Sequence, residues 1–419
     1  MAKLIINGGN KLEGEVRLAG NKNSVLKLLP ATLLADSPST ITNVPNIRDV
    51  DVMLMIMEKL GAKVTRNIDT VTIDPTSLSS YEIDAELSAK IRASVVLAPA
   101  LLAKFGKAII TPPGGDQIGE RLLDTHFNMM RDFGVEIERK DGRFFLDWKE
   151  KKTPNIFLEE VSVTATEMGI MMAAASQGEV IIEDAACEPH VRDLSNFVAK
   201  MGADFQGMGS NTLRITGKKN LNGAEQRVMA DYIEGGTFAI ASAITGGKVK
   251  IMDFEPENYK MILEYLGAMG VKHEAKNDEL IILPSNLRAS RRKFQTRPWP
   301  GFPTDLMSPF IVLATQTEGT VLCHDWMYEW RMFFVDDLIS MGANIFIADP
   351  HRVIINGKTK LMADILFSKD LRAGISLILA ALVAEGKSVV ENIEMVERGY
   401  QNIDSRLTSL GADVTRVDD

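Results

Sequence analysis

Six amphipathic segments along the chain each run into a glycine, and residues of alternating polarity follow each glycine. The glycines lie 68 to 73 residues apart. The copies are Leu60-Gly61-Ala62, Phe133-Gly134-Val135, Met201-Gly202-Ala203, Met269-Gly270-Val271, Met341-Gly342-Ala343 and Leu410-Gly411-Ala412. A glycine just after a helix is typical of the C′ position, where a positive φ causes no Cβ strain. The pattern therefore predicts a module of roughly 70 residues, repeated six times, in which a strand follows each helix.

A second pattern has the same period. A strongly apolar segment ends in small or polar residues, and a β-rich segment follows at Gly106, Gly178, Gly247, Gly319 and Gly386, with residues 36–41 filling the first slot. Segments such as 168–175 and 375–384 are apolar on every side, which predicts buried helices. Each module thus reads helix, strand, helix, strand, roughly βαβα with an added strand.

The length of 419 residues is too great for one hydrophobic core and suits two domains. We predict an α/β fold with three modules per domain, buried parallel helices at the centre and sheets outside. The polar stretch 220–227 leaves three of the repeated glycines on each side. Residues 22–229 form the first predicted domain, which carries the loop 111–121. Residues 1–21 and 230–419 form the second.

Composition excludes several classes of function. The net charge of −9 argues against a general nucleic-acid binder, because no basic surface is supplied. Cys187 and Cys323 have no CxxC spacing and fit a reduced cytoplasm. The five histidines show no ligand spacing, so no metal site is expected. The longest apolar runs are shorter than the roughly 20 residues of a membrane span, and no signal peptide is expected before the first predicted strand.

Each buried helix is predicted to begin near polar or charged residues. These are Lys22 with Asn21 and Asn23, Arg92, Ser162 with Thr164 and Thr166, Glu234, Asp305 with Thr304, and Arg372. N-capping explains Ser162, Thr304 and Asp305. It does not explain Lys22, Arg92 or Arg372, because a cation at a helix N-terminus opposes the helix dipole. If these helices point their N-termini at one cleft, free N–H groups and cations together form an anion trap.

Two proline-rich and glycine-rich segments stand out. Residues 111–121 contain too few apolar side chains to pack in a core, so this loop is predicted to lie on the surface and to move. It carries Asp116 and Arg121, and Asp116 by itself reads most simply as a solvated turn residue. Residues 296–307 are either a rigid linker or a preorganised wall that aims Asp305 at a substrate.

Taken together, the motifs resemble those of the UDP-N-acetylglucosamine 1-carboxyvinyltransferases, a group within the enolpyruvyl transferase family. The resemblance covers essentially the whole chain. It rests on Gly20-Asn21-Lys22-Asn23-Ser24, Arg92-Ala93-Ser94, Pro113-Gly114-Gly115, Gly119-Glu120-Arg121, Pro300-Gly301-Phe302-Pro303-Thr304-Asp305, Asp370-Leu371-Arg372-Ala373 and Glu397-Arg398-Gly399-Tyr400. The inverted α/β barrel of this family, with two domains of three repeats and an active site in the cleft between them, agrees with the periodicity.

The resemblance implies transfer of the enolpyruvyl group of phosphoenolpyruvate to the 3-hydroxyl of UDP-N-acetylglucosamine, with release of phosphate. The implied reaction proceeds by addition and elimination through a tetrahedral intermediate and opens peptidoglycan synthesis in the cytoplasm. It needs no metal and no organic cofactor. The only implied partners are the two small-molecule substrates.

The resemblance also implies roles for individual residues. The implied catalytic residues are Asp116 as the acid for the enol carbon, Asp305 as the general base, Lys22 and Arg398. The implied phosphoenolpyruvate ligands are Lys22, Asn23, Arg121, Arg372 and Arg398. The implied UDP-N-acetylglucosamine ligands are Asn23, Arg92, Arg121, Asp124, Ser162, Asp305 and Met327.

Three positions depart from the family pattern. Many relatives carry cysteine where this chain has Asp116, and a carboxyl group donates a proton only if its pKa is raised. We therefore expect Asp116 to do the work of that thiol, and we expect resistance to fosfomycin, which alkylates it. Glu160 stands where relatives commonly have lysine, and an acid there would repel a diphosphate. Leu122 replaces the usual proline after Arg121.

Two other functions stay open. One is the shikimate-pathway relative, 5-enolpyruvylshikimate-3-phosphate synthase, which the Asn21-Lys22-Asn23 triplet and the segment 300–305 disfavour. The other is a non-catalytic binder of UDP-sugar, for which Asp116 and Glu160 would be signs of decay. For an enzyme we expect anionic substrates to draw the two domains together and to bring the loop 111–121 down.

Overall fold

The computed structural model describes residues 2–116 and 118–418, which group into two compact units. Unit 1 contains the described residues of 1–19, 116–120 and 230–419, and unit 2 contains residues 20–115 and 121–229. The chain therefore changes unit after Ala19 and after Met229, and also on either side of residues 116–120. The grouping of residues 116–120 with unit 1 differs from the prediction, which placed the whole loop 111–121 in the domain of residues 22–229.

One repeat of unit 2 shows the module most completely. Its elements are β9 (Asn155–Phe157), α6 (Val163–Ala175), β10 (Gly178–Glu183), α7 (Pro189–Met201), β11 (Asp204–Gln206) and β12 (Thr212–Gly217). The strand β9 pairs parallel with β10, and β12 pairs antiparallel with both β10 and β11. The predicted succession of helix, strand, helix and strand with an added strand is confirmed, and a short parallel strand precedes it.

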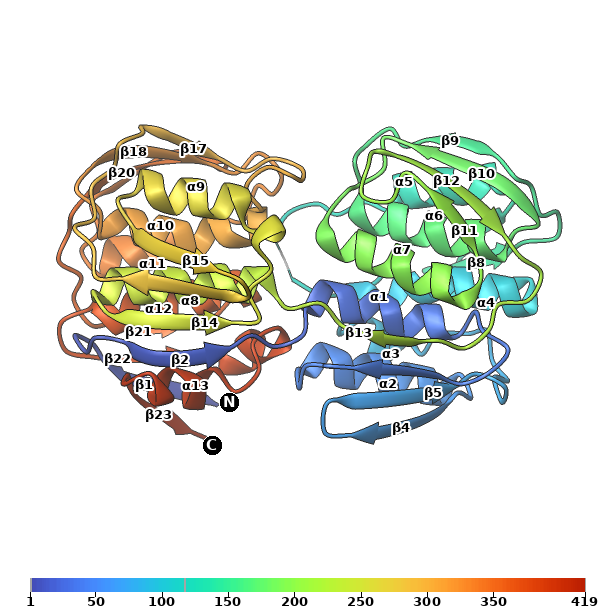
Figure 1. Cartoon of the computed structure of the whole chain (residues 1–419), viewed down its shortest axis with the longest axis horizontal. Coiled ribbons are helices and arrows are strands. Elements are labelled where there is room, and N and C mark those ends of the chain that lie inside the picture. The colour runs from blue at the N-terminus through green and yellow to red at the C-terminus, as the bar shows by residue number, and fades with distance from the viewer. Residues whose placement is uncertain (1, 117, 419) are drawn as a thin grey trace. The chain divides into compact units, whose positions relative to one another are not determined.

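The other two repeats of unit 2 contain the remaining elements of that unit. These are α1 (Lys22–Thr32), β3 (Ser39–Thr42), α2 (Arg48–Lys59), β4 (Lys63–Asn67), β5 (Thr70–Asp74), α3 (Ala85–Ser88), the 3-10 helix η1 (Arg92–Leu97), α4 (Ala98–Phe105), β6 (Lys107–Ile110), α5 (Asp124–Asp132), β7 (Glu136–Lys140), β8 (Arg143–Asp147) and β13 (Glu225–Arg227). The chain of unit 2 enters at α1 and leaves after β13 (Figure 1).

Unit 1 repeats the same order. Its elements are β1 (Lys3–Asn7), β2 (Glu13–Arg17), α8 (Tyr232–Thr245), β14 (Lys248–Met252), η2 (Pro256–Asn258), α9 (Lys260–Ala268), β15 (Lys272–Lys276), β16 (Glu279–Leu283), β17 (Lys293–Gln295), η3 (Thr304–Leu306), α10 (Met307–Thr315), β18 (Gly319–His324), α11 (Val335–Ser340), β19 (Ile345–Asp349), β20 (Arg352–Gly357), β21 (Ile365–Phe367), α12 (Leu371–Val383), β22 (Lys387–Glu391), η4 (Ile393–Arg398), α13 (Ile403–Ser409) and β23 (Asp413–Val417).

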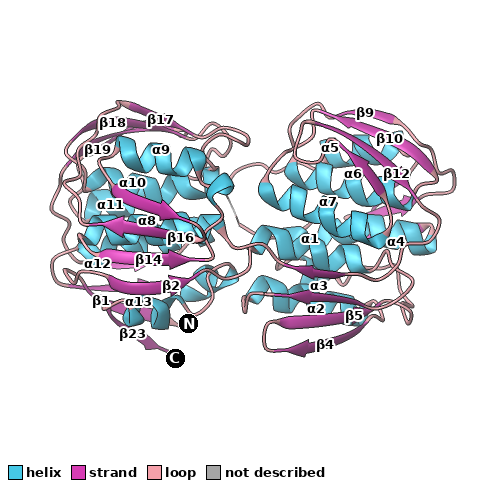
Figure 2. Cartoon of the chain, viewed as in Figure 1, coloured by secondary structure: helices cyan, strands magenta, loops and turns pink. Residues whose placement is uncertain are grey.

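Each unit carries three sheets over the described residues (Figure 2). Unit 2 has the strand orders β11-β12-β10-β9, β13-β3-β5-β4 and β6-β8-β7, and unit 1 has β21-β22-β1-β23, β15-β16-β14-β2 and β17-β18-β20-β19. Segments far apart in the chain complete three of them. The strand β13 pairs parallel with β3, β2 pairs parallel with β14, and β1 lies between β22 and β23. In each unit, strands from the first and last parts of its sequence therefore pair with each other.

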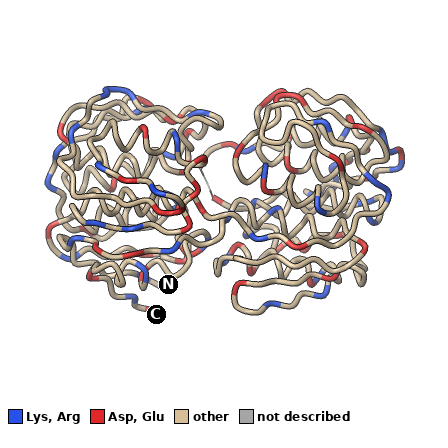
Figure 3. Tube along the Cα trace, viewed as in Figure 1, with Lys and Arg blue, Asp and Glu red and all other residues tan. Residues whose placement is uncertain are grey.

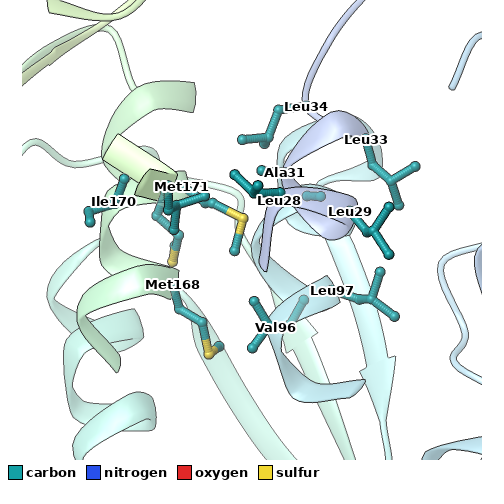
Figure 4. Close-up of a cluster of buried hydrophobic side chains, with 14 of the residues drawn as sticks. Leu28, Leu29, Ala31, Leu33, Leu34, Val96, Leu97, Met168, Ile170 and Met171 are labelled. Carbon is teal, nitrogen blue, oxygen red and sulfur yellow. The ribbon is translucent and has the colours of Figure 1, made fainter. Parts of the chain in front are cut away.

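The apolar helices lie at the centre of each unit, as predicted. In unit 2, α1, η1 with α4, and α6 pack against one another. Figure 4 shows Leu28 and Leu29 of α1, Val96 and Leu97 of η1, and Met168 of α6 in one buried cluster. In unit 1, α8, α10 and α12 pack together in the same way. Helices that lose all of their apolar surface to such packing need no polar face.

The six repeated glycines confirm the predicted helix ends. All of them have a positive φ, between 85° and 124°. A Cβ on Gly134 would in addition overlap the carbonyl oxygen of Glu150. Acidic and basic residues are interspersed along the trace of each unit (Figure 3). Among the described helices, none is both long and apolar enough to cross a membrane.

Candidate active site

The starts of the buried helices carry the residues that the sequence singled out. Lys22 is the first residue of α1, Arg92 the first of η1, and Arg372 the second of α12. Ser162 caps α6, because its hydroxyl accepts a hydrogen bond from the backbone N–H of Ala165 at 3.3 Å. Asn21 caps α1 by accepting from the N–H of Ser24 at 2.8 Å. The predicted phase of the repeat is therefore confirmed at these helices.

The N-cap interpretation is wrong for Thr304 and Asp305. Both residues lie in η3, which begins after Pro303 without a side-chain cap. Their side chains are occupied elsewhere, so they cannot serve the helix. The caps that sequence reasoning missed are Asp231 on α8 and Asp370 on α12, each of which accepts two backbone N–H bonds. An aspartate directly before an apolar helix was the available signal for both caps.

In unit 2 the first cation at a helix start has a buried acidic partner. The Nζ of Lys22 lies 2.9 Å from Oδ2 of Asp49, and the two side chains are only 10% and 4% exposed. Asn23, the next residue of α1, is half-buried. A buried ammonium needs a nearby anion to offset its desolvation. Asp49 supplies one here, and an anionic ligand would meet a lysine that is already held in place.

Arg92 and Arg121 meet in unit 2. The Nη2 atom of Arg92 donates to the carbonyl oxygen of Arg121 at 2.5 Å. Their charges also act on His126, whose pKa is lowered to about 4, mainly by burial and then by Arg92 and Arg121. The ring of His126 is therefore neutral near pH 7. Its Nε2 lies 2.6 Å from Oγ1 of Thr164 in the first turn of α6.

His126 is a residue that sequence reasoning missed, since an isolated histidine gives no signal of its own. Its Nδ1 is buried and makes no hydrogen bond within the described structure. Asp124 is exposed at the first position of α5, and α5 packs against α6, which Ser162 caps. These residues thus come from four places: Arg92 from the start of η1, Arg121 from the loop before α5, Asp124 and His126 from α5, and Ser162 from the N-cap of α6.

In unit 1 the carboxylate of Asp305 lies between two buried guanidinium groups. Its Oδ2 accepts from Nη2 of Arg372 at 2.7 Å, and its Oδ1 accepts from Nη2 of Arg331 at 3.2 Å. Burial, the largest single effect, favours the neutral form of Arg372, but the charges of Asp305, Tyr400 and Asp231 and the hydrogen bond to Asp305 together outweigh it, and the pKa of Arg372 is raised. The side chain of Asp305 is still 24% exposed. It is therefore fixed in orientation and open to a ligand.

Arg331 was also missed, and a buried aspartate explains its place. Asp325 is fully buried and lies 3.6 Å from Nε of Arg331. Asp325 also accepts hydrogen bonds from the hydroxyls of Thr296 and Thr304 and from the N–H of Met327 at 3.0 Å. These bonds fix both ends of the segment 296–307. They favour the wall that aims Asp305 over a simple linker.

The third pair in unit 1 joins Asp116 to Arg398. The Nη1 atom of Arg398, the last residue of η4, donates to Oδ1 of Asp116 at 2.6 Å, and the two side chains are only 11% and 17% exposed. The interpretation of Asp116 as a solvated turn residue is therefore wrong. The carbonyl oxygen of Ile118 accepts from the N–H of Trp330 at 3.1 Å. Both contacts explain why residues 116–120 group with unit 1.

The predicted site residues thus fall into three groups within the units. Lys22 and Asn23 begin α1, and Arg92 and Arg121 meet beside α5 and α6. In unit 1, Arg372 and Arg331 bind Asp305, and Arg398 binds Asp116. The backbone N–H of Met327 binds Asp325, which lies beside Arg331. Asp370 belongs to this group because the charges of Arg331 and Asp116 both act on it. Burial raises the pKa of Asp370, Arg331 opposes this increase, and Asp116 adds to it. Convergence of all the cations on one cleft stays a prediction.

Comparison with known proteins adds the family. The model of the EPSP synthase (3-phosphoshikimate 1-carboxyvinyltransferase) family matches residues 6–407. The chain is 41% identical to a UDP-N-acetylglucosamine 1-carboxyvinyltransferase of Borreliella burgdorferi, with 100% of this chain and 99% of that protein covered. It is 42% identical to the protein of that name from Treponema denticola, with 99% of both covered.

Two solved structures share the fold. The enolpyruvyl transferase NikO from Streptomyces tendae is 24% identical with a TM-score of 0.90, and 99% of each chain is covered. An EPSP synthase from Acinetobacter baumannii is 18% identical with a TM-score of 0.78 over the whole of both chains. At these identities the likeness concerns the fold, and it confirms the predicted two-domain α/β architecture. With its family match and its full-length relatives, the chain belongs to the EPSP synthase (3-phosphoshikimate 1-carboxyvinyltransferase) family of enolpyruvyl transferases.

Proposed function

We propose that this enzyme transfers the enolpyruvyl group of phosphoenolpyruvate to the 3-hydroxyl of UDP-N-acetylglucosamine and releases phosphate. This is the first committed step of peptidoglycan synthesis, and we place it in the cytoplasm. Curated relatives at 37 to 42% identity over nearly the full chain carry the name of this activity. The structural observation that supports the proposal most is the carboxylate of Asp305, oriented by two buried arginines and partly exposed.

Asp305 is the proposed general base. In the addition step the 3-hydroxyl oxygen forms a bond to C2 of phosphoenolpyruvate, and its proton passes to the carboxylate. Because Arg331 and Arg372 both stabilise the anionic form, Asp305 becomes a stronger base when one of them turns to an anionic ligand. We assign that turn to Arg372, which is also a proposed ligand of phosphoenolpyruvate.

Asp116 is the proposed acid. It gives a proton to C3 while the hydroxyl oxygen attacks C2. In the resulting tetrahedral intermediate C3 is a methyl group and the C2–C3 bond is single. The elimination step then breaks the C2–O bond to the phosphate and removes a proton from C3. Arg398, which donates a hydrogen bond to Asp116 at 2.6 Å, is also a proposed ligand of phosphoenolpyruvate.

Fixed cations are proposed to hold the charged donor. Phosphate and carboxylate groups bind best to guanidinium and ammonium groups that are already oriented, because charge-assisted bonds then form without reorganisation. Lys22, Asn23, Arg121, Arg372 and Arg398 are the proposed ligands. Asp49 holds Lys22, Asp305 holds Arg372, and Asp116 holds Arg398.

The acceptor is proposed to bind through Asn23, Arg92, Arg121, Asp124, Ser162, Asp305 and Met327. Neutral His126 beside Arg92 is compatible with an uncharged nucleobase or sugar nearby. The exposed Glu160 lies just before the N-terminus of α6 and would weaken the binding of a diphosphate. The placement of the whole site in a cleft between the two domains stays a prediction.

An assay of phosphate release tests the proposal. The full chain is incubated with phosphoenolpyruvate and, in parallel, with UDP-N-acetylglucosamine, with 3-phosphoshikimate or with neither. We expect phosphate only with the UDP-sugar. Release with 3-phosphoshikimate would assign the chain to the shikimate reaction instead. Binding of the UDP-sugar without any release would identify a non-catalytic binder.

The variant Asp305→Asn provides the matched test of the proposed base. The amide keeps the size of the side chain and can still accept a hydrogen bond from Arg331, but it cannot take a proton. We expect kcat to fall by roughly 100-fold or more, the usual contribution of general base catalysis, with little change in the KM for phosphoenolpyruvate. An unchanged kcat would remove Asp305 from the mechanism.

A further inference from the structure

The ion pair of Asp116 and Arg398 brings the proposed acid into contact with a proposed ligand of phosphoenolpyruvate, the enolpyruvyl donor. The Nη1 atom of Arg398 lies 2.6 Å from Oδ1 of Asp116, and both side chains are largely buried. We propose that the carboxylate of Asp116 occupies the donor-binding guanidinium of Arg398 in the empty enzyme, and that phosphoenolpyruvate displaces it and thereby converts Asp116 into a protonated acid. This inference rests on the proposed function and adds an exchange step to it.

The exchange is favourable for Arg398. A guanidinium that is only 11% exposed cannot be left without an anion, because its charge would be buried and uncompensated. A phosphate dianion offers more charge and more acceptor oxygens than a carboxylate. Arg398 therefore gains when the phosphate of the donor replaces Asp116, and it is paired both before and after the exchange.

The same exchange is unfavourable for the anionic form of Asp116. The carboxylate loses the positive charge of Arg398 and gains the negative charge of the donor. Asp370 is a second buried acid in its surroundings, since the charge of Asp116 contributes to the raised pKa of Asp370. A carboxyl group among like charges takes up a proton. Asp116 then binds one proton from solvent, gives it to C3 of phosphoenolpyruvate and returns to the carboxylate.

The chain after Asp116 limits how far the displaced side chain can go. The carbonyl oxygen of Ile118 accepts from the N–H of Trp330 at 3.1 Å. Gly119 has a φ of 140°, and a Cβ there would overlap the carboxylate of Glu329. These contacts attach the backbone two and three residues away to unit 1. They keep Asp116 beside the donor after Arg398 has been taken over.

Isothermal titration of phosphoenolpyruvate into the full chain, in two buffers with different ionisation enthalpies, measures the protons taken up on binding. The wild type is compared with Asp116→Asn and Asp116→Ala, because the amide can still accept a bond from Arg398 and the alanine cannot. The control is Asp413→Asn, which removes an equal charge from an exposed strand of the same unit. Thermal unfolding verifies that each variant is folded.

We expect the wild type and the control to take up close to one more proton per donor than either variant at position 116. Subtraction cancels any change in the protonation of the donor itself. The alanine variant should also bind phosphoenolpyruvate roughly tenfold more tightly, because the competing carboxylate is gone. Equal proton uptake in all four proteins would overturn the proposal. So would weaker donor binding, or none, in the alanine variant.

The phosphate-release assay separates this result from the proposed function. Turnover by the wild type with equal proton uptake in every variant would refute the exchange and leave the function intact. A proton uptake that depends on Asp116, without turnover of the UDP-sugar, would support the exchange and refute the proposed transfer.

Discussion

At the scale of single residues, Asp116 gives the enzyme a carboxylate where its relatives commonly carry a thiol. The two cysteines of the chain do not replace that thiol. Burial raises the pKa of Cys187, and it raises the pKa of the fully buried Cys323 still further. Neither residue is therefore a reactive thiolate at neutral pH.

We expect fosfomycin to leave the wild-type activity unchanged and to inactivate the variant Asp116→Cys progressively. The reason is that alkylation needs a nucleophilic sulfur at this position. Residual phosphate release is measured against the time of exposure to the drug, and Asp116→Asn serves as the thiol-free control. Rapid covalent loss of wild-type activity would contradict the assignment of Asp116.

Glu160 is the second residue whose charge we expect to matter. Its side chain is exposed just before the start of α6, close to where a bound diphosphate is proposed to lie. The variant Glu160→Lys should bind UDP-N-acetylglucosamine several-fold more tightly at low salt, and the gain should shrink as salt screens the charge. Titration calorimetry measures the affinity.

The neighbouring exposed Glu159 offers a matched control. Glu159→Lys makes the same change of charge one residue earlier. If the two lysine variants gain equally, the effect reflects only the general field of the surface. If neither gains, Glu160 does not face the diphosphate.

At the scale of elements, each repeat depends on a glycine that ends one helix and starts one strand. Gly134 and Gly202 both have a positive φ, of 91° and 124°. They differ in their surroundings. A Cβ on Gly134 would overlap the backbone oxygen of Glu150, whereas the nearest atom to a Cβ on Gly202 is the flexible Lys218 side chain at 4.0 Å.

We therefore expect Gly134→Ala to destabilise the protein more than Gly202→Ala. The backbone strain alone costs about 1–2 kcal/mol in both variants, and Gly134→Ala adds a clash with backbone that cannot move aside. Urea unfolding of the two variants gives the free energies. Equal losses would show that the surroundings of Gly134 relax without cost.

The buried helices of unit 2 also share charged side chains. The carboxylate of Glu167 on α6 is fully buried, 3.4 Å from Nζ of Lys27 on α1 and 3.9 Å from Nε2 of His190 on α7. Burial raises the pKa of Glu167 to about 7, against the opposing effect of Lys27 and with a small increase from Glu188. The folded protein therefore binds this proton more tightly than the unfolded chain does.

This shift predicts a pH dependence of stability. The contribution of Glu167 is complete below its unfolded pKa of 4.5 and is lost as the pH rises through about 7. Glu167→Gln stays neutral throughout, so its stability relative to the wild type should increase between pH 5 and pH 8, by up to roughly 3 kcal/mol. Thermal or urea unfolding across this range measures the difference. A difference that does not change with pH would contradict the raised pKa.

At the scale of the whole molecule, two units of three repeats each are built from one chain. The chain has a net charge of −9, and Lys22 and Arg372 are buried cations at helix starts. We keep the prediction that anionic substrates draw the domains together. Small-angle scattering of the full chain should then show a smaller radius of gyration with UDP-N-acetylglucosamine than without it. Equal radii would contradict closure, and addition of UMP alone would show whether the sugar is needed.

The repeat was predictable because it depends on local chemistry. Glycines with positive φ and helices that are apolar on all sides leave a direct trace in the sequence, and this trace located the starts of α1, η1 and α12 to within one residue. The partners of the charged residues left no such trace. Asp116 and Arg398 are separated by 282 residues, and only the tertiary fold brings them together.

The module, the number of its copies, its phase and the polar residues that begin each buried helix could be predicted from the order of residues alone, because helix ends and apolar periodicity depend on neighbours along the chain. The contacts of those residues depend on the folded molecule. It gave Asp305 two arginines, attached Asp116 to unit 1 and placed the unrecognised Arg331 and His126 beside the predicted residues. Ion pairs and pKa values depend on distances through space and on burial, which residues far apart in sequence supply together.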